Sequence, residues 1–409
     1  MSHRCRFCSA PLSLSFVDLG TTPLANSNLR SRDDIAGERS FPLAVMVCES
    51  CFLVQTTESV PADAIFHDDY AYFSSISPSW VEHARRYAET MTGRFSLGAG
   101  SLVVEVASND GYLLQHFVGA GIPVLGIEPA GNCAREAEAR GVPTLVDFFG
   151  SNTAERVVRE KGQADLAAAN NVLAHVPDIS DFIAGFKALL KPKGVVTFEF
   201  PHLLNLIALT QFDTIYHEHY SYLSLTSVER ILARHGLMVF DVEQLPTHGG
   251  SLRVFAGHAE AGWSEQPGLR NVRAAETAAH LADRGGYLGF TAKVEKVRDD
   301  FLRFLSEAKA EGKTVVGYGA AAKGNTFMNY CRLTDGDIAF VADRSPHKQG
   351  RLLPGVHAPI VDPELIRQTR PDYVVILPWN LAREIEQQLG FIRDWDGRFV
   401  TAIPQLRTF

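Results

Sequence analysis

The chain has 409 residues, more than one ordinary hydrophobic core holds, so we expect two or three domains. Apolar residues make up 46% and charged residues 21%, as in soluble globular proteins, and no apolar run reaches the ~20 residues of a membrane span. A formal net charge of −8 argues against a nucleic-acid-binding surface, which needs clustered Lys and Arg. The N-terminus lacks the apolar core of a secretory signal, so we expect a cytoplasmic protein with neither membrane nor nucleic-acid partners.

Four cysteines form two closely spaced pairs, Cys5 with Cys8 and Cys48 with Cys51. Each CxxC pair contributes two thiolates from one tight turn, so the two pairs predict a tetrahedral Zn²⁺ site. The alternative is a redox-active CxxC. A four-cysteine site is coordinatively closed, and this zinc should therefore stabilise a small β-rich module, residues 1–75, without doing chemistry.

Strands and helices alternate from residue 102 onward. We expect strands at residues 102–107, 123–129, 143–149, 164–174 and 194–200, with helices ending near residue 119 and over residues 134–141, 154–162 and 182–191. This alternation predicts an α/β, Rossmann-like domain over residues 76–285, with a parallel sheet covered on both faces. Such sheets bind ligands beyond the carboxyl ends of their strands.

A second, smaller α/β series follows a long amphipathic helix over residues 288–313. Its strands are expected at residues 315–318, 338–345, 372–379 and 399–404, in a Rossmann-like domain over residues 286–409. Residues 201–257 fit neither series. They contain a predicted helix, residues 227–236, and two strands, residues 237–245 and 251–257, that extend the first sheet.

The loop EVASNDG after the first strand is the first candidate ligand site. It contains Glu105, Ser108, Asn109, Asp110 and Gly111. A glycine there permits close backbone approach to a ligand, and the helix that follows offers free N–H groups. A dinucleotide site prefers GxGxxG, because the diphosphate needs several glycines. Acids beside a diphosphate are unfavourable, but they are favourable beside the methionyl ammonium of S-adenosylmethionine (SAM).

Polar residues also end the next three strands. Glu128 is placed to accept hydrogen bonds from the ribose hydroxyls. Asp147 is placed to accept one from the adenine amino group, and Phe148 is placed to stack on the adenine ring. Asn170 and Asn171 end the fourth strand. Together these positions favour SAM as the ligand, with NAD as the alternative.

The stretch YHEHYSYLSL, residues 216–225, holds two histidines, a glutamate and three tyrosines. His217 and His219 form an HxH pair that would share one side of a strand and could bind a metal. A packed aromatic patch is another interpretation. The third is a proton-transfer site.

Taken together, the CxxC pairs, EVASNDG, YHEHYSYLS and VVGYGAAAKGNT resemble the NDP-hexose C-methyltransferases of deoxysugar biosynthesis. The resemblance covers essentially the whole chain. It implies that SAM binds in the middle domain and that the substrate is a nucleotide-linked 4-keto sugar, most commonly dTDP-linked. The carbon methylated is then C3 or C5, next to the C4 ketone.

The resemblance also implies roles for individual residues. It makes His219 the general base and Tyr216 and Glu218 substrate-orienting groups, and it places Tyr70 and His175 in the active site. Carbon methylation needs such a base, because a proton next to the ketone must leave before carbon becomes a nucleophile. Histidine is largely neutral, and so basic, at cytoplasmic pH.

The developing enolate oxygen also needs donors. The candidates are Tyr216, Tyr222, Tyr70 and His175.

Two further stretches are predicted to contact the substrate. HGGSLR supplies His248, Gly249 and Arg253, with a plain hairpin turn as the alternative. GYGAAAKGN supplies Lys323 and Asn325 at a helix start that suits a phosphate of the sugar nucleotide. A degenerate domain that has lost nucleotide binding is the alternative there.

Two rival functions remain from the sequence. A SAM-dependent O- or N-methyltransferase acting on a sugar or secondary metabolite would use the same pocket and base. A non-enzymatic, zinc-containing interaction protein would need none of the strand-end acids. The sequence does not separate C3 from C5 methylation, and it does not name the sugar, the nucleotide or the oligomeric state.

Overall fold

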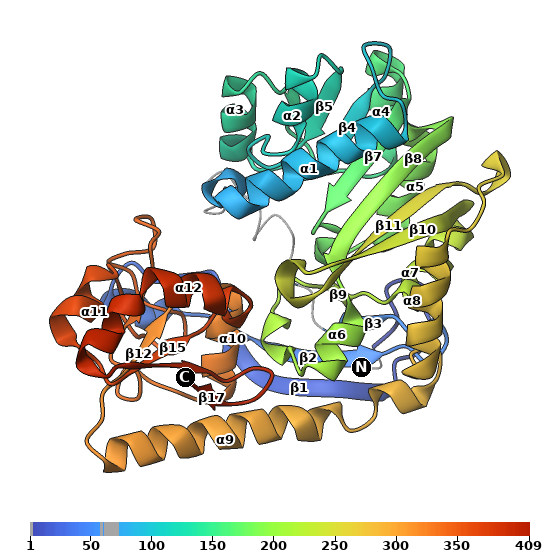
Figure 1. Cartoon of the computed structure of the whole chain (residues 1–409). Helices are drawn as coiled ribbons and strands as arrows, with labels where there is room; N and C mark the ends of the chain where they lie inside the picture. The colour runs from blue at the N-terminus through green and yellow to red at the C-terminus, as the bar shows by residue number, and fades with distance from the viewer. Residues whose placement is uncertain (1–2, 58–59, 61–72) are drawn as a thin grey trace.

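The computed structural model describes residues 3–57, 60 and 73–409, so the predicted active-site residue Tyr70 lies outside the described residues. Within that part of the chain, the strands form three sheets (Figure 1). No helix of the described residues is long and apolar enough to cross a membrane.

The N-terminal sheet is antiparallel and has the order β1-β2-β3-β9. Its strands are β1 (Leu14–Pro23), β2 (Ser40–Val47), β3 (Val54–Thr56) and β9 (Ser221–Tyr222). The last strand comes from the middle of the chain: Tyr222 pairs with Val54, and Ser221 pairs with Gln55. The stretch 216–225 therefore completes the sheet of the N-terminal module.

The middle sheet has the order β10-β11-β8-β7-β4-β5-β6, and only β11 among these described strands runs antiparallel to both its neighbours. The strands are β4 (Val103–Val106), β5 (Val124–Ile127), β6 (Thr144–Leu145), β7 (Ala164–Asn170), β8 (Leu190–Pro201), β10 (Leu237–Leu245) and β11 (Ser251–His258). The predicted extension of this sheet by the strands after residue 236 is confirmed. Strand β6 is shorter than predicted.

Helices cover both faces of the middle sheet, as expected for buried parallel strands. One face packs against α1 (Pro78–Arg94), α2 (Leu114–Gly119) and α3 (Gly131–Ala139). The other face packs against α4 (Ser151–Lys161), α5 (Ile179–Leu189), α7 (Leu225–Arg234) and α8 (Pro267–Ala278). Helix α1 had no counterpart in the sequence prediction. A short helix, α6 (Leu203–Ala208), follows β8.

The C-terminal sheet has the order β14-β13-β12-β15-β16-β17 and is parallel except for β17. Its strands are β12 (Val315–Tyr318), β13 (Val341–Ala342), β14 (Ile360–Val361), β15 (Tyr373–Ile376), β16 (Arg398–Thr401) and β17 (Arg407–Thr408). Its helices are α10 (Ala322–Tyr330), α11 (Glu364–Thr369) and α12 (Ala382–Gln388). The predicted second α/β unit is therefore present.

Helix α9 (Phe290–Ala310) runs along the bottom of the molecule from the N-terminal sheet to the C-terminal unit (Figure 1). Phe290 at its start stacks on Phe16 of β1, with ring centroids 4.3 Å apart. The N-terminal and C-terminal units share one apolar core through this contact. The domain boundaries after residues 75 and 285 remain predictions.

Candidate active site

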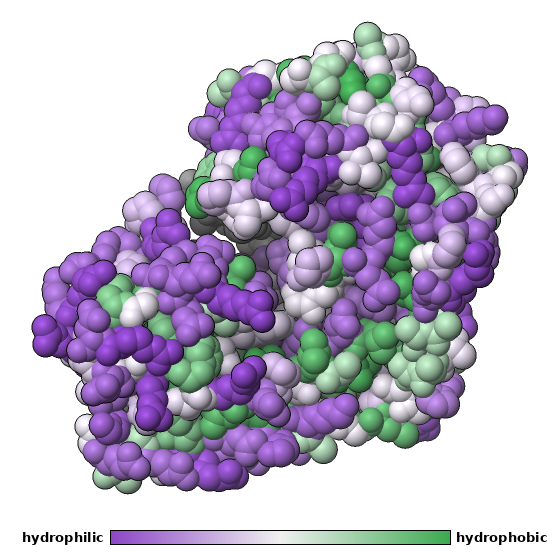
Figure 2. Space-filling model, viewed as in Figure 1, coloured by the Kyte–Doolittle hydropathy of each residue, from purple (hydrophilic) through white to green (hydrophobic). Residues whose placement is uncertain are grey.

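A cleft of about 1540 Å³ lies between the middle sheet and the other two units. Figure 2 shows the corresponding hollow on one face of the molecule. All three units contribute side chains to its wall, among them Asn26, Glu128, His219 and Lys323. The strand order reverses between β4 and β7, and ligands of doubly wound sheets bind at such a point.

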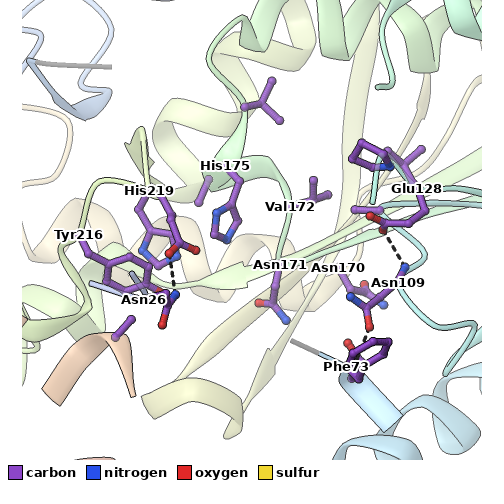
Figure 3. A pocket seen from close by; sticks show the side chains of 18 of the residues that line it. Asn26, Phe73, Asn109, Glu128, Asn170, Asn171, Val172, His175, Tyr216 and His219 are labelled. Atoms are coloured by element: carbon purple, nitrogen blue, oxygen red, sulfur yellow. Dashed lines mark hydrogen bonds between the residues drawn. The ribbon is translucent and has the colours of Figure 1, made fainter. Parts of the chain in front are cut away.

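Glu128, just beyond β5, lies at the end of the cleft next to the middle sheet (Figure 3). Its two carboxylate oxygens accept hydrogen bonds from the backbone N–H groups of Asn109 and Ala130, both at 2.9 Å. Burial raises the pKa of Glu128, and the two N–H groups act against that rise. The strand-end acid predicted from the sequence is thus held at the cleft wall.

The side chains of the EVASNDG loop mostly point away from the cleft, which differs from our expectation. Of its five predicted ligand residues, only Asn109 lines the wall. Asp110 is fully buried and forms an ion pair with Arg140 at 3.2 Å. Glu105 is buried within the sheet, and burial raises its pKa well above the ordinary value.

Ser108 and Gly111 serve packing. A Cβ built on Gly126 would lie 2.4 Å from the Ser108 Oγ, and one on Gly111 would lie 3.2 Å from the Cα of Ala137 in α3. Gly111 also has a φ of +77°. The glycine therefore permits close contact between the loop and a helix of the protein.

The remaining predicted cofactor residues do line the cleft. Asp147 and Phe148 follow β6, and the ring of Phe148 is 45% exposed, which suits stacking on a purine. Asn170 ends the central strand β7 and Asn171 follows it, and their Oδ1 atoms are buried without a hydrogen-bond partner in the described part of the chain. An acid, an exposed ring and unpaired amide oxygens at strand ends along one edge of the sheet fit SAM.

The other end of the cleft holds the histidine predicted as the base. His219 Nδ1 lies 2.8 Å from the backbone carbonyl oxygen of Thr214. Since a carbonyl oxygen only accepts, Nδ1 carries the proton and Nε2 keeps its lone pair. Burial lowers the pKa of His219 well below its ordinary value. The imidazole is therefore neutral and able to accept a proton.

Two aromatic rings hold this imidazole in place (Figure 3). The ring of Tyr216 lies 4.1 Å from it, centroid to centroid, and the ring of His175 lies 4.6 Å from it at a steep angle. Burial lowers the pKa of His175 to about 4, so His175 is also neutral near pH 7. Tyr216 and His219 are brought together by a turn closed by the His219 N–H and the Tyr216 carbonyl oxygen, 2.9 Å apart.

Glu218 joins the cleft to the N-terminal module. Its Oε1 accepts a hydrogen bond from Asn26 Nδ2 at 2.6 Å. Burial raises the pKa of Glu218, against the effect of that bond and of the Lys348 charge. No sequence pattern indicated Asn26, which stands 192 positions from Glu218.

The metal interpretation of the HxH pair is not supported. The pair lies on a turn rather than a strand, and His217 Nε2 points to the carbonyl oxygens of Phe41 and Pro42, each 3.2 Å away. Tyr222 does not line the cleft, although its ring lies 6.1 Å from that of His219. Burial raises the pKa of its phenol.

The HGGSLR stretch divides between the cleft and the interior. His248 lines the cleft in a left-handed conformation, with φ +55°, and its Nε2 lies 3.4 Å from the Nδ2 of Asn171. Arg253 is buried instead and pairs with Glu199 and Glu243, each at 2.9 Å. The structure therefore does not bring Arg253 to the cleft.

The C-terminal unit supplies cations to the cleft. Lys323 lines the wall and donates to Asn380 Oδ1 at 2.8 Å, and Lys348 and Arg351 also line it. Asn325, by contrast, is buried inside α10. The predicted Lys323 is thus in the cleft, and Lys348 and Arg351 join it there.

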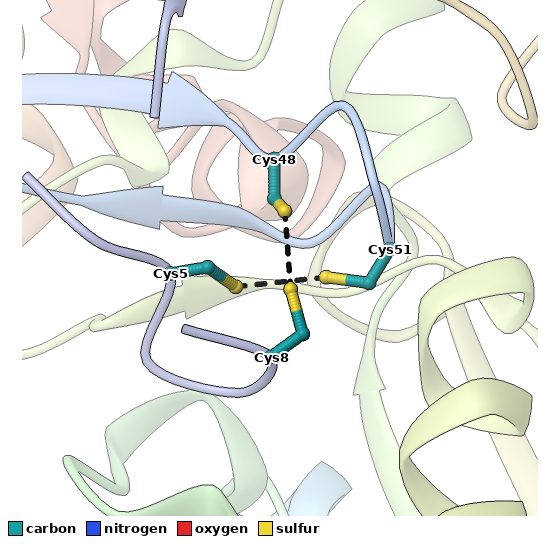
Figure 4. A group of neighbouring side chains, drawn as sticks. All are labelled: Cys5, Cys8, Cys48 and Cys51. Carbon is teal, nitrogen blue, oxygen red and sulfur yellow. Dashed lines mark hydrogen bonds between the residues drawn. The ribbon is translucent and has the colours of Figure 1, made fainter. Parts of the chain in front are cut away.

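The four paired cysteines converge at the edge of the N-terminal sheet (Figure 4). Their sulfur atoms all lie within 4.8 Å of one another, with Cys5 to Cys51 at 3.5 Å and Cys8 to Cys48 at 3.4 Å. Tetrahedral Zn²⁺ with Zn–S bonds of about 2.3 Å would separate the sulfurs by about 3.8 Å. The donors therefore fit Zn²⁺, and within the described ranges no other group of three or more potential ligands does.

The cysteine cluster contacts the turn that carries His219. Arg6, between Cys5 and Cys8, lies over the ring of Tyr220 at 5.3 Å and donates to the carbonyl oxygen of Thr56 at 3.0 Å. The Thr56 N–H in turn donates to the Tyr220 carbonyl oxygen at 3.1 Å. The cysteine cluster thus supports the turn that carries the base, although the four cysteines do not themselves line the cleft.

Comparison with known proteins assigns the family. The family described as "C-methyltransferase C-terminal domain" matches residues 246–404, and those described as "Putative zinc binding domain" and "Methyltransferase domain" match residues 5–66 and 80–242. C-methyltransferase NovU of Streptomyces niveus is 38% identical over 404 residues, which span 98% of this chain and 96% of that protein. The chain belongs to the NovU-like C-methyltransferases.

This C-methyltransferase is SAM-dependent and has an N-terminal zinc-binding cysteine cluster. Membership in a methyltransferase family excludes the alternative of a non-enzymatic interaction protein. A ubiquinone biosynthesis O-methyltransferase of Rhodopseudomonas palustris (strain BisA53) is 23% identical over 163 residues, 34% of this chain and 64% of that protein. A magnesium protoporphyrin IX methyltransferase from Synechocystis PCC 6803 has a TM-score of 0.33 at 15% identity, covering 43% of this chain and 78% of that one.

Proposed function

We propose that this C-methyltransferase acts on a nucleotide-linked 4-keto deoxysugar and methylates the carbon next to the C4 ketone, C3 or C5. The observation that carries the proposal is the tautomer of His219. Its Nδ1–H is fixed by the Thr214 carbonyl oxygen, so the basic Nε2 is available in the cleft that also holds Glu128. An oxygen or nitrogen nucleophile needs less help from a base than a carbon does.

The reaction begins with proton transfer from the sugar carbon to His219 Nε2. The C–H bonding electrons move into the ketone, and its oxygen takes on negative charge. The Tyr216 phenol, whose ring packs against the base, is the described group that we assign to donate to that oxygen. His175 also packs against the base and helps to keep its ring in place. Bound SAM supplies the methyl group to the resulting carbon nucleophile. Holding the reactants in line is the main contribution of the fold.

The nucleotide half of the substrate is assigned to the C-terminal side of the cleft. Lys323, Lys348 and Arg351 line this side, and their charges suit a diphosphate. Glu218 and His248 are assigned to the sugar hydroxyls, since both line the cleft and both carry polar groups. A dTDP carrier is the choice implied by the family resemblance.

The proposal is tested with a panel of 4-keto nucleotide sugars and SAM carrying a ¹³C-labelled methyl group. We expect one product whose labelled carbon is bonded to a ring carbon, seen as a carbon–carbon coupling by NMR. A label on oxygen or nitrogen, or no transfer to any keto sugar, would overturn the proposal. A matched sugar with a reduced, C4-hydroxyl ring should not react.

A further inference from the structure

Trp379 links the C-terminal unit to the residues around the base. It begins the 3₁₀ turn Trp379–Leu381 beyond β15, and its Nε1–H donates to Asp213 Oδ2 at 2.7 Å. Asp213 lies in the 3₁₀ turn Phe212–Thr214 and is only 1% exposed. The next residue, Thr214, supplies the carbonyl oxygen that fixes His219. The indole therefore bonds to the side chain adjacent to the group that orients the base.

The face of the same indole supports Lys323. The Lys323 Nζ lies 4.9 Å from the ring centroid of Trp379 and donates to the Oδ1 of Asn380 in the same 3₁₀ turn. A cation held on an indole face is stabilised by the ring electrons, most strongly where water is excluded. The two contacts fix where the ammonium of Lys323 lies along the cleft wall.

The edge of the indole meets the loop that carries His248. A Cβ built on Gly249 would lie 2.5 Å from the Trp379 Cη2 and 2.8 Å from the Gln211 Nε2. Gln211 Nε2 also donates to the Gly249 carbonyl oxygen at 2.8 Å. This close approach, with φ +90° at Gly249, requires glycine at that position.

Apolar contacts close the same interface. Phe212 packs on Phe327 and Tyr330 of α10, with ring centroids 6.0 and 5.3 Å away. Lys323 stands at the start of that helix. The Phe212–Thr214 turn and α10 are therefore docked side by side, with the indole bridging them.

We propose that Trp379 is a positioning residue, whose indole locks the C-terminal unit against the turn that fixes His219 and holds the Lys323 ammonium at the cleft. The inference rests on the proposed role of His219 as base. Burial raises the pKa of Asp213 to about 6, with the Lys323 charge and the indole N–H acting against it, so this carboxylate depends on both partners. Loss of the indole N–H leaves a buried carboxylate oxygen unpaired, which favours movement of the turn.

The test compares Trp379→Phe with Trp395→Phe. Trp395 belongs to the same unit, and its Nε1–H donates to the Pro371 carbonyl oxygen at 2.9 Å, away from the cleft. Both variants lose one indole N–H bond, but only Trp379→Phe should lower kcat, on the order of tenfold to a hundredfold, as small misplacements of a base do. The Kd for SAM, measured by calorimetry, should stay within about twofold of the wild-type value for both variants, since neither indole lines the cleft.

A double variant and a substrate-free measurement complete the design. Asp213→Ala removes the other partner, and Trp379→Phe/Asp213→Ala should lose no more than the larger single loss in kcat, because the two residues act as one unit. The pKa of His219 can be followed by NMR of labelled histidine. The Lys323 charge helps to lower this pKa, so a Lys323 ammonium that moves away when the indole is lost should let it rise in Trp379→Phe. The pKa should not rise in Trp395→Phe.

Additive losses, an unchanged His219 titration, or equal effects of the two Trp variants would overturn the inference. The titration needs no substrate, so it decides the matter even if the wild-type enzyme methylates no keto sugar, an outcome that would reject the proposed function alone.

Discussion

The imidazole of His219 donates its Nδ1–H to the main-chain carbonyl oxygen of Thr214 at 2.8 Å. The group that orients the base is therefore the backbone, and no carboxylate is needed for that purpose. A carboxylate partner would stabilise the charged imidazolium and raise the pKa of the base. A carbonyl partner leaves the imidazole neutral in its buried position, and its Nε2 is ready to accept a proton.

The first prediction concerns the base itself. His219→Gln should bind SAM with normal affinity and lose turnover on the order of 10²- to 10⁴-fold, the usual contribution of a general base. His217→Gln makes the same exchange two positions away, where the Nε2 points to the backbone carbonyl oxygens of Phe41 and Pro42. It should keep most of the activity. Near-normal turnover of His219→Gln would remove His219 as the base.

The second prediction is the pH dependence of kcat/KM. Burial lowers the pKa of His219 below 6.5, so its active, neutral form persists as the pH falls to that lowered value. Activity should therefore be present above the depressed pKa and be lost only below pH 6.5. An acid limb at or above the ordinary histidine pKa of about 6.5 would contradict this assignment.

The third prediction concerns the bond between Asn26 and Glu218. Asn26→Ala leaves a buried glutamate without its amide donor, which costs about 1–3 kcal/mol in comparable cases. We expect kcat/KM to fall by about tenfold or more, with SAM affinity unchanged. Asn152→Ala, on the exposed side of α4, is the matched control. Equal kcat/KM values for the two variants would show that the Asn26–Glu218 hydrogen bond does not contribute to catalysis.

The fourth prediction separates the cofactor end of the cleft from the base. Glu128→Gln removes the charge that we assign to the ribose hydroxyls, so the Kd for SAM should rise by about tenfold, as loss of a charge-assisted bond does. Glu136→Gln, on the exposed face of α3, should bind SAM normally. Isothermal calorimetry measures both values. An unchanged Kd for SAM in Glu128→Gln would show that Glu128 does not bind the ribose.

The fifth prediction is the effect of zinc removal. Chelation should unfold the N-terminal module, because such clusters stabilise small domains that lack a large core. Turnover should fall with it, since Arg6 supports Tyr220 and β3 pairs with β9 next to the base. SAM binding should survive. Unfolding is followed by circular dichroism, zinc release by a chromogenic dye, and turnover by an activity assay on the same samples. Full turnover after complete zinc loss would contradict this coupling.

Parts of the cleft were predictable because parallel strands end at one edge of a sheet. Glu128, Asp147 and Asn170 were placed correctly at the wall by that rule alone. The direction of a side chain within a loop depends on packing, and here the rule failed. Glu105 and Asp110 follow the same strand but turn inward, the latter toward Arg140.

Contacts between distant segments leave no local pattern. Asn26 meets Glu218 across 192 positions, and Trp379 meets Asp213 across 166. Arg253 shows the converse problem, since an arginine after a glycine turn has the same sequence pattern whether it faces a ligand or, as here, two glutamates of the protein. The three-unit wall of the cleft became visible only in the fold.

Strand β9 gives the two residues that follow the His219 turn a place in the sheet of the zinc module. An engineer who grafts the first 75 residues of a relative onto this chain also replaces the neighbour of that strand. Hybrid enzymes will therefore keep their catalytic geometry only if the paired strands β3 and β9 come from the same protein.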